Sequence, residues 1–311
     1  MLAVFYHKLF ARHLEDYAHP EQPARVKAII ERLETGSLRR RYDLIEPGPA
    51  RGDWIERIHH RSHYDRITGL RPTSPTLLDT GDTVVTAASP EAALLAAGAA
   101  VAAVRAVLGG EYTSAFCCVR PPGHHAEYDR AMGFCLFNNI AIAAADLIEH
   151  GGLKRVAIID WDIHHGNGTD HAFADSPEVL FVSLHQYPHY PGTGSADSTG
   201  TGKGRGFTMN LPMEAGAGPD EYLAAFDDRI IPALHDFRPQ FVLISAGFDA
   251  HRDDPLAQIN LESDTYAEMT TRLRDVAARH CDGRIVSILE GGYDLTALAD
   301  SVEQHLTALI D

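Results

Sequence analysis

Basic residues are scarce in this sequence, and that scarcity limits the partners it can bind. Lys and Arg number 27 against 43 Asp and Glu, which gives a formal net charge of −16 at pH 7. A protein that binds nucleic acid needs a basic face to neutralise phosphates, so this balance argues against a nucleic-acid partner. An acidic surface suits a cationic or neutral substrate instead.

Long apolar runs are also missing. The Ala-rich run Ala92–Val104 is followed by Arg105 and is shorter than the roughly 20 residues that a transmembrane helix needs. We expect this run to form a buried helix. Residues Met1–Phe10 lack the apolar core of a signal peptide. We therefore expect no membrane partner and a cytoplasmic location.

Cysteine occurs only four times in 311 residues, so a disulfide framework is not expected. Cys117 and Cys118 are adjacent inside the apolar run Ala115–Val119, which favours packed thiols and a reducing setting. The chain also lacks an internal repeat and any linker rich in Gly, Pro or Ser. We predict a single domain that spans residues 1–311.

Short apolar runs predict β-strands, and helical patterns lie between several of them. The strand candidates are Leu2–Tyr6, Ala115–Val119, Val156–Ile159, Val179–Leu184, Phe241–Ile244 and Ile285–Leu289. Apolar residues recur at helical spacing at Leu223, Phe226, Ile230 and Leu234, and again at Met269, Leu273 and Val276. Pro232 should kink the first of these helices or end it early. The alternation of strands and helices predicts an α/β fold with a mainly parallel sheet and helices on both faces.

Two carboxylates and two imidazoles follow the strand candidate Val156–Ile159, in the segment Asp160-Trp161-Asp162-Ile163-His164-His165. Ligands bind outside the carboxyl ends of strands in open α/β sheets. Asp162 and His164 are two apart in an extended segment, so both side chains can reach one point. A carboxylate and a neutral imidazole are suitable ligands for Zn²⁺ or a similar divalent ion. A polar turn capping the next helix is the alternative, but four such groups together favour half of a metal site.

Polar clusters follow other strand candidates in the same way. They are Arg120–His125, Ser183–His185, Ser245–His251 and Glu290–Tyr293. A parallel sheet delivers the carboxyl ends of its strands to one edge, so these clusters can share one site. Asp249 would then complete a set of two carboxylates and one imidazole. Three protein ligands with an open position are typical of catalytic rather than structural zinc.

The other side chains at this edge suggest hydrolysis. His124 and His125 could supply general acid–base catalysis near neutral pH. Tyr293, which follows two glycines, could donate a hydrogen bond to a developing oxyanion. A metal, a base and an oxyanion donor together indicate metal-assisted hydrolysis of a carbonyl compound.

Several of these residues have a purely structural alternative. Tyr293 could cap the core, and Asp249 could cap a helix N-terminus. Phe134 and Tyr190 would ordinarily be core aromatics. The remaining histidines of interest are interpreted as surface or structural residues, namely His59, His60, His63 and His251.

Several long motifs closely resemble those of the zinc-dependent histone deacetylase family, above all its class II branch and its bacterial relatives, the histone deacetylase-like and acetylpolyamine amidohydrolases. The matching segments stand in the family's order and are His19-Pro20-Glu21 with Arg25, Arg120–Ala126, Gly133–Asn139, Asp160–Thr169, Ser245–Asp249 and Gly291–Tyr293. The resemblance covers essentially the whole chain. It implies the arginase–deacetylase fold, with a central, mostly parallel eight-stranded sheet flanked by helices, for residues 1–311. It also implies a metal-dependent amidohydrolase that removes acyl groups, acetyl above all, from the Nε-acyl-lysine side chains of proteins or peptides.

The resemblance also implies catalytic roles for individual residues. The positions that match the zinc ligands are Asp162, His164 and Asp249, with Fe²⁺ as the alternative ion in vivo. His125 matches the general base that later protonates the leaving amine. His124 would act electrostatically, oriented by Asp160, and Tyr293 would polarise the acyl carbonyl. Asn167 stands where class I members carry an acid, and a neutral partner stabilises an imidazolium less, so a lower pKa is expected for His125.

Further positions match the family's substrate-binding and cation-binding groups. The substrate-binding positions are Gly133, Phe134, Tyr190, Leu256 and Gly291, with the two aromatics as tunnel walls and the Gly133 carbonyl at the floor. A structural potassium ion would bind Asp160, Asp162, His164, Ser183 and Leu184. A second cation would bind Phe173, Ser176, Val179 and Phe207.

Two rival functions remain. The first is the same chemistry on an acetylated polyamine, for which relatives place an acidic residue at the rim. The matching position is Leu256, which argues against a polyamine, although the acidic surface could still attract one. The second is a catalytically silent module that binds acyl amines. It would require a lost ligand, base or tyrosine, and none is missing.

Overall fold

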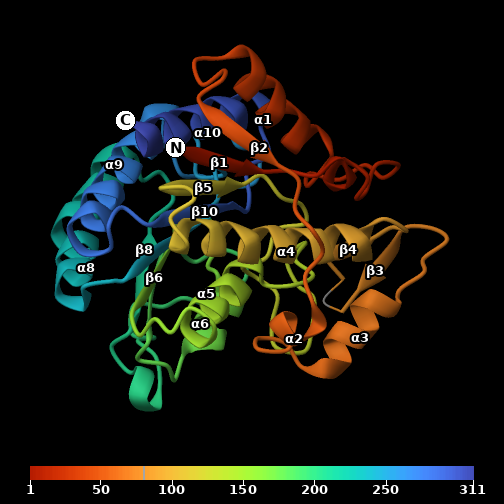
Figure 1. Ribbon diagram of the computed structural model, residues 1–311, viewed down its shortest axis with the longest axis horizontal. Coiled ribbons are helices and arrows are strands. Elements are labelled where there is room, and N and C mark those ends of the chain that lie inside the picture. The colour runs from red at the N-terminus through yellow and green to blue at the C-terminus, as the bar shows by residue number, and fades with distance from the viewer. Residues whose placement is uncertain (80) are drawn as a thin grey trace.

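A sheet of eight parallel strands runs through the centre of the protein (Figure 1). The computed structural model describes residues 1–79 and 81–311. The strands of this sheet are β1 (Leu2–Phe5), β2 (Tyr42–Ile45), β5 (Ser114–Cys117), β6 (Val156–Asp160), β7 (Val179–Gln186), β8 (Thr208–Met213), β9 (Phe241–Ala246) and β10 (Ile285–Leu289). Their order is β2-β1-β5-β10-β9-β6-β7-β8, and every neighbouring pair is parallel. The predicted α/β fold with a mostly parallel eight-stranded sheet is confirmed.

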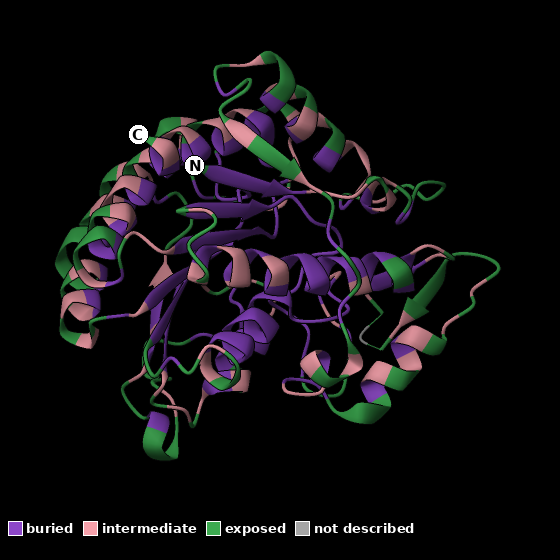
Figure 2. Ribbon diagram, in the orientation of Figure 1, coloured by how far each residue is buried: buried purple, intermediate pink, exposed green. Residues whose placement is uncertain are grey.

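Helices cover both faces of the sheet (Figure 1). On one face lie α4 (Ser89–Leu108), α5 (Asn139–Glu149) and α6 (Asn167–Phe173). On the other lie α1 (Ala24–Thr35), α9 (Ser263–His280) and α10 (Leu295–Ile310), with α7 (Pro219–Ala225) and α8 (Ile231–Phe237) beside α9. Smaller elements are α2 (Gly52–Ile55), α3 (Arg61–Gly69), and the hairpin of β3 (Thr76–Leu78) and β4 (Thr83–Val85). Figure 2 shows the central strands and the inward faces of the helices buried, with exposed residues on the outer faces of the helices and on the edge strand β2.

The six strands predicted from apolar runs all form, with ends that shift by at most two residues. The edge strands β2 and β8 escaped prediction because they are only partly buried and carry a mixed polar and apolar pattern. The predicted packing of cysteine is also confirmed, since all four cysteines are free and buried.

Helix α4 is longer than the apolar run Ala92–Val104 from which it was predicted. It has 20 residues and is long and apolar enough to cross a membrane by length and composition, so the argument from shortness was wrong. Burial accounts for the apolar composition of this helix instead, because 67% of its apolar 18-residue stretch is buried inside the fold. It packs against α5, β5 and β10, which confirms the prediction of a buried helix.

Pro232 marks a change of helical geometry, as predicted. The chain forms α7, then a π-helical segment Phe226–Ile230, and then α8, which has Pro232 in its first turn. Proline lacks an N–H, so it is tolerated in the first turn of a helix but not in its interior. The wider π-helical turn keeps the predicted apolar side chains Phe226, Ile230 and Leu234 buried on both sides of this break.

A buried ion network attaches α1 to the core beneath the carboxyl ends of the strands. Glu21 accepts hydrogen bonds from the guanidinium groups of Arg120 (2.7 Å) and Arg25 (3.0 Å). All three residues are fully buried. Burial alone would raise the pKa of Glu21, but Arg120 lowers it well below the ordinary 4.5. Glu21 therefore stays charged and compensates the positive charges of the two buried arginines.

Replacing Glu21 by Gln should lower the free energy of unfolding by about 3–5 kcal/mol, because two buried guanidinium groups lose their anionic partner. The Glu21 pKa is depressed in the folded state, so its contribution is fully present above about pH 4.5 and is lost as the pH falls through the folded value. Urea unfolding at pH 7 measures the change. Glu15→Gln removes the partner of Arg12 in a solvent-accessible pair and should cost less than about 1 kcal/mol. Similar losses in both variants would contradict the assignment.

Candidate active site

The five central strands of the sheet end at one edge, and each has a polar cluster predicted from the sequence within its last residues or shortly after its carboxyl end. In sheet order these strands are β5, β10, β9, β6 and β7. Residues that lie far apart in the sequence therefore meet there. The sheet topology thus places the predicted clusters side by side, as the carboxyl ends of parallel strands require.

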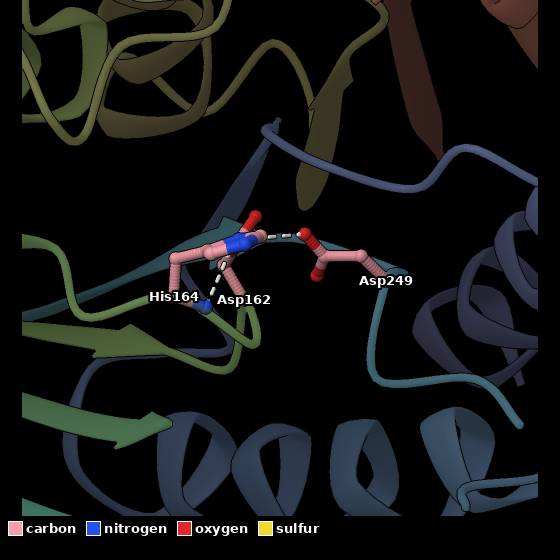
Figure 3. A group of neighbouring side chains, drawn as sticks. All are labelled: Asp162, His164 and Asp249. Atoms are coloured by element: carbon pink, nitrogen blue, oxygen red, sulfur yellow. Dashed lines mark hydrogen bonds and ion pairs between the residues drawn. The ribbon is translucent and has the colours of Figure 1, made fainter. Parts of the chain in front are cut away.

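Asp162, His164 and Asp249 converge at this edge (Figure 3). The two carboxylates and the imidazole offer ligand atoms that all lie within 4.8 Å of one another. Asp162 and His164 follow β6, and Asp249 follows the adjacent strand β9. His164 Nδ1 lies 3.0 Å from Asp162 Oδ1 and 3.2 Å from Asp249 Oδ2. The structure thus brings together the three residues that the sequence predicts as metal ligands.

These three residues fit a divalent cation. Both carboxylates are buried, and within residues 1–79 and 81–311 Asp249 Oδ2 has no hydrogen-bond donor other than the His164 ring at 3.2 Å. Burial alone would lower the pKa of His164, but the hydrogen bonds and charges of Asp162 and Asp249 raise it to about 10. A group this rich in buried negative charge attracts a cation. Two carboxylate oxygens and one imidazole nitrogen form a donor set that Zn²⁺ and similar ions prefer.

Backbone N–H groups hold the two carboxylates in place. Asp249 Oδ1 accepts from the Ile163 N–H (2.9 Å), and Asp162 Oδ2 accepts from the Gly291 N–H (2.8 Å). The turn after β10 approaches so closely that a side chain at Gly291 would collide with both carboxylates. Gly247 is equally constrained, because a side chain there would collide with Asp162. The glycines are therefore required for the close approach of backbone to ligand.

The adjacent imidazoles of His124 and His125 have opposite electrostatic surroundings. His124 Nδ1 lies 2.9 Å from Asp160 Oδ2. Burial alone would lower the pKa of His124, but Asp160 and Asp162 raise it to about 10. Burial lowers the pKa of His125 well below its ordinary value, and His124 and His164 lower it further. At neutral pH His124 is a cation and His125 is a neutral base, which is how neighbouring groups acquire different acid–base roles.

Asn167 is the hydrogen-bond partner of His125, with 2.7 Å between Asn167 Oδ1 and His125 Nδ1. The expectation that this neutral partner gives His125 a lower pKa than an acidic partner would stays a prediction. In the structure, burial and the two neighbouring imidazoles lower the pKa of His125, while the hydrogen bond with Asn167 raises it. Asn167 is the first residue of α6, which begins directly after the loop that carries Asp162 and His164.

A narrow pocket of about 150 Å³ leads to the ligand set. Its lining includes all five predicted substrate-binding positions, Gly133, Phe134, Tyr190, Leu256 and Gly291, together with His124, His125, Asp162, His164 and Tyr293. The rings of Tyr190 and His125 meet edge to face at 5.2 Å, and those of Phe134 and Tyr293 at 6.3 Å. Phe134 and Tyr190 are therefore pocket walls rather than core aromatics.

Tyr293 lies beside the ligands on a turn that is held from both sides. Its backbone N–H donates to Asp254 Oδ2 (2.7 Å), and Arg25 Nε donates to the Gly292 carbonyl (2.6 Å). The Arg25 guanidinium also lies 5.1 Å from the centre of the Tyr293 ring. Burial and the charge of Asp249 raise the pKa of Tyr293 well above its ordinary value. The phenol therefore stays protonated and can act as a hydrogen-bond donor.

Three acidic residues to which the sequence analysis assigned no role support the site. Asp82, close to the β3–β4 hairpin, accepts from the Gly133 N–H (3.1 Å) and from the Tyr190 hydroxyl (2.7 Å). Glu290 accepts from the backbone N–H groups of Gly123 (2.6 Å) and His124 (3.1 Å). Glu127 accepts from the Asn167 amide (2.5 Å). Only Glu290 had a sequence signal, since it directly precedes the two glycines of a recognised motif.

The predicted positions of the two further cations lie along β6, β7 and the adjoining loops. Asp160 and Ser183 are paired residues of β6 and β7, and Leu184 follows Ser183. Phe173 ends α6, Ser176 lies in the following loop and Val179 begins β7. Phe207 precedes β8, and its carbonyl accepts from the Phe181 N–H of β7 at 2.9 Å. Both sites remain predictions.

The remaining histidines have structural roles, as expected. His59 and His63 are buried and bonded to backbone groups, the former to the Glu127 carbonyl (2.8 Å) and the latter to the Leu136 carbonyl (2.8 Å). His60 caps α3 through the Ser62 N–H. The ring of His251 is buried and accepts from the Asp253 N–H (3.2 Å).

Comparison with known proteins agrees with this site. Residues 19–309 match the family description "Histone deacetylase domain". The chain is 40% identical to a "Probable deacetylase" of Archaeoglobus fulgidus, over 94% of this chain and 81% of that protein. It is 43% identical to "Histone deacetylase 10, chloroplastic" of Oryza sativa subsp. japonica, over 94% of this chain and 70% of that protein. It is 41% identical to "Histone deacetylase-like amidohydrolase" of Pseudomonas aeruginosa, over 88% and 72% of the two chains.

The fold agrees as well. The crystal structure of the "HDA15 HD domain" superimposes with a TM-score of 0.94 at 36% identity, and the match covers 99% of this chain and 88% of that one. This likeness identifies the arginase–deacetylase fold. The family match spans most of the sequence, and the motifs that it contains are the ones gathered at the carboxyl edge of the sheet. The chain therefore belongs to the histone deacetylase family of amide hydrolases.

Proposed function

We propose that this protein hydrolyses Nε-acyl-lysine side chains of proteins or peptides, acetyl-lysine above all, with a divalent ion held by Asp162, His164 and Asp249. One observation carries the proposal. A narrow pocket with aromatic walls ends at a buried, anionic ligand set beside a neutral imidazole and a phenol. An acylated alkylamine is long, thin and uncharged along its stem, so such a pocket fits it.

The residues divide the chemistry among them. When bound, a divalent ion such as Zn²⁺ supplies a Lewis acid that polarises the acyl carbonyl and lowers the pKa of water. His125, neutral and hydrogen-bonded at Nδ1, accepts the proton of the attacking water at Nε2 and later gives it to the leaving amine. The cationic His124, oriented by Asp160, stabilises the negative charge that develops. The Tyr293 hydroxyl donates to the developing oxyanion.

The proposal extends to two structural cations. Potassium would bind the oxygen atoms contributed by Asp160, Asp162, His164, Ser183 and Leu184, and a second cation those of Phe173, Ser176, Val179 and Phe207. Carbonyl, carboxylate and hydroxyl oxygens are hard donors that suit such ions. The support is positional, because Asp160 and Ser183 are paired residues of β6 and β7 and the other residues lie on β7, at the end of α6 or in the adjoining loops.

An acetylated polyamine is the second candidate substrate. Asp82 in the pocket lining favours it, because a carboxylate attracts an ammonium group. That carboxylate, however, already accepts from the Gly133 N–H and the Tyr190 hydroxyl. Leu256 lines the pocket with an apolar side chain, and aromatic walls do not compensate an internal ammonium. These contacts favour the lysine substrate.

The first test concerns the ligands. Asp162→Ala should abolish both metal binding and turnover, because a remnant of two ligands holds zinc poorly. Elemental analysis of the purified variant measures occupancy, and an acetyl-lysine peptide assay measures turnover. Asp253→Ala, which removes an exposed carboxylate outside the ligand set, is the control and should keep both. Full occupancy in Asp162→Ala would rule out this ligand assignment.

The second test concerns the oxyanion donor. Tyr293→Phe should lower kcat by about 10²- to 10³-fold and change KM far less, as expected when one donor to a developing oxyanion is removed. Steady-state kinetics on an acetyl-lysine peptide measure both parameters. Tyr128→Phe, at an exposed tyrosine, should leave them unchanged. An unchanged kcat in Tyr293→Phe would remove this residue from the mechanism.

The third test separates lysine from polyamine. The unmodified enzyme should have a higher kcat/KM for acetyl-lysine peptides than for N8-acetylspermidine. Leu256→Glu should shift the ratio towards the polyamine, because it adds a carboxylate that can pair with the distant ammonium. Leu44→Glu, at an exposed leucine of the edge strand β2, controls for added surface charge. The lysine assignment fails if the unmodified enzyme prefers the polyamine or if Leu256→Glu leaves the ratio unchanged.

A further inference from the structure

The amide of Asn167 can face His125 in two ways, and only one of them makes His125 a base. If the amide oxygen accepts from His125, the proton is on Nδ1 and the lone pair is on Nε2. If the amide nitrogen faces the ring, the proton moves to Nε2 and the base is lost. The structure has the oxygen 2.7 Å from His125 Nδ1. The amide therefore needs a further hydrogen-bond partner that fixes this orientation.

Glu127 is the group that holds it. Asn167 Nδ2 donates to Glu127 Oε1 at 2.5 Å, and also to the backbone carbonyl of His125 at 3.3 Å. An ionised carboxylate only accepts hydrogen bonds, so the NH₂ end of the amide must face Glu127. The oxygen end must then face the imidazole. A flipped amide would place its oxygen against a buried carboxylate, which is repulsive.

Glu127 is itself fixed in position. The residue is buried, its N–H donates to the Arg130 carbonyl (3.0 Å), and its own carbonyl is bonded to the buried His59 ring (2.8 Å). On the outer side, the carboxylate lies 2.9 Å from Nδ1 of His171, a ring that is half-exposed. A carboxylate, an amide and an imidazole thus form a continuous chain from near the surface to the pocket.

We propose that Glu127 is a positioning residue of the site, whose carboxylate locks the Asn167 amide so that His125 keeps its Nε2 lone pair for the substrate side. The inference rests on the proposed role of His125 as the base. In this arrangement the Glu127 carboxylate acts on the His125 imidazole through the intervening neutral amide of Asn167. It still supplies the orientation that an acid in direct contact with the imidazole would supply.

Single substitutions at Glu127 separate the effect of orienting the Asn167 amide from the effect of the negative charge of the carboxylate. In Glu127→Gln the side-chain oxygen can still accept from Asn167, so kcat should fall by no more than about tenfold, the difference between charged and neutral hydrogen bonds. In Glu127→Ala the Asn167 amide can flip, and kcat should fall by about 10²-fold or more, as for loss of a general base. KM should stay near that of the unmodified enzyme in both variants. His171→Gln removes the outer partner of the carboxylate and should leave kcat unchanged.

A double-mutant cycle supplies a result that a purely structural role would not give. Asn167→Asp alone places two carboxylates in hydrogen-bond contact, so it should lower kcat strongly. Adding Glu127→Gln provides an NH₂ donor for the new carboxylate and should raise kcat by about tenfold over Asn167→Asp, within the usual coupling of residues in contact. A double variant no more active than Asn167→Asp alone would overturn the proposal.

The tautomer can be observed without turnover. The ¹⁵N shifts of the His125 ring in the full-length protein should report a protonated Nδ1 in the unmodified enzyme and in Glu127→Gln, and a mixture of tautomers in Glu127→Ala. Unchanged shifts in Glu127→Ala would refute the positioning role even if activity falls. If the unmodified enzyme hydrolyses neither acetyl-lysine peptides nor acetylpolyamines, the proposed function fails, and these shifts still decide the role of Glu127.

Discussion

Burial of negative charge at the end of β6 is the constraint on which the rest of the site depends. Asp160, Asp162 and Asp249 are all nearly inaccessible to water. Carboxylates are buried only where cations and N–H donors compensate them. His124 compensates Asp160, backbone N–H groups from two loops approach the other pair, and the proposed divalent cation would complete the balance. The turns after β9 and β10 must therefore lie against β6, which in turn positions the pocket.

The central part of the fold could be predicted because its strands are buried on both faces. Uniformly apolar runs such as Ile285–Leu289 carry that signal, and the alternation with helices indicates parallel pairing. The edge strands β2 and β8 carry no such signal, since one side of each is partly exposed. Helix boundaries were also hard to predict, because α4 extends beyond its Ala-rich run through residues that are polar or conformationally special, such as Ser89 and Pro90.

The ligands and the histidine pair could be predicted because they follow strands and belong to recognisable motifs. The roles of the supporting acids Asp82, Glu127 and Glu290 could not be predicted, because each acts through contacts with residues far away in the sequence. Asp82 reaches Gly133 over 51 residues, and Glu290 reaches Gly123 over 167. Such pairs leave no periodicity and no characteristic spacing. Glu127 is the most instructive example, since an acid next to a histidine motif looks like an ordinary surface residue until the fold brings Asn167 against it.

The positions of the site differ in how far they tolerate substitution, and the glycines that approach the ligands are the most restricted. At Gly247 and Gly291 even a methyl group would displace a carboxylate, and at Gly133 it would collide with the His125 ring. Substitution at any of these three glycines would therefore disturb the ligand carboxylates or the His125 base. Leu256 and Tyr190, by contrast, are partly exposed wall residues, and the Tyr190 hydroxyl donates to Asp82. Substitutions that alter substrate choice are therefore expected at the walls of the pocket rather than at its floor.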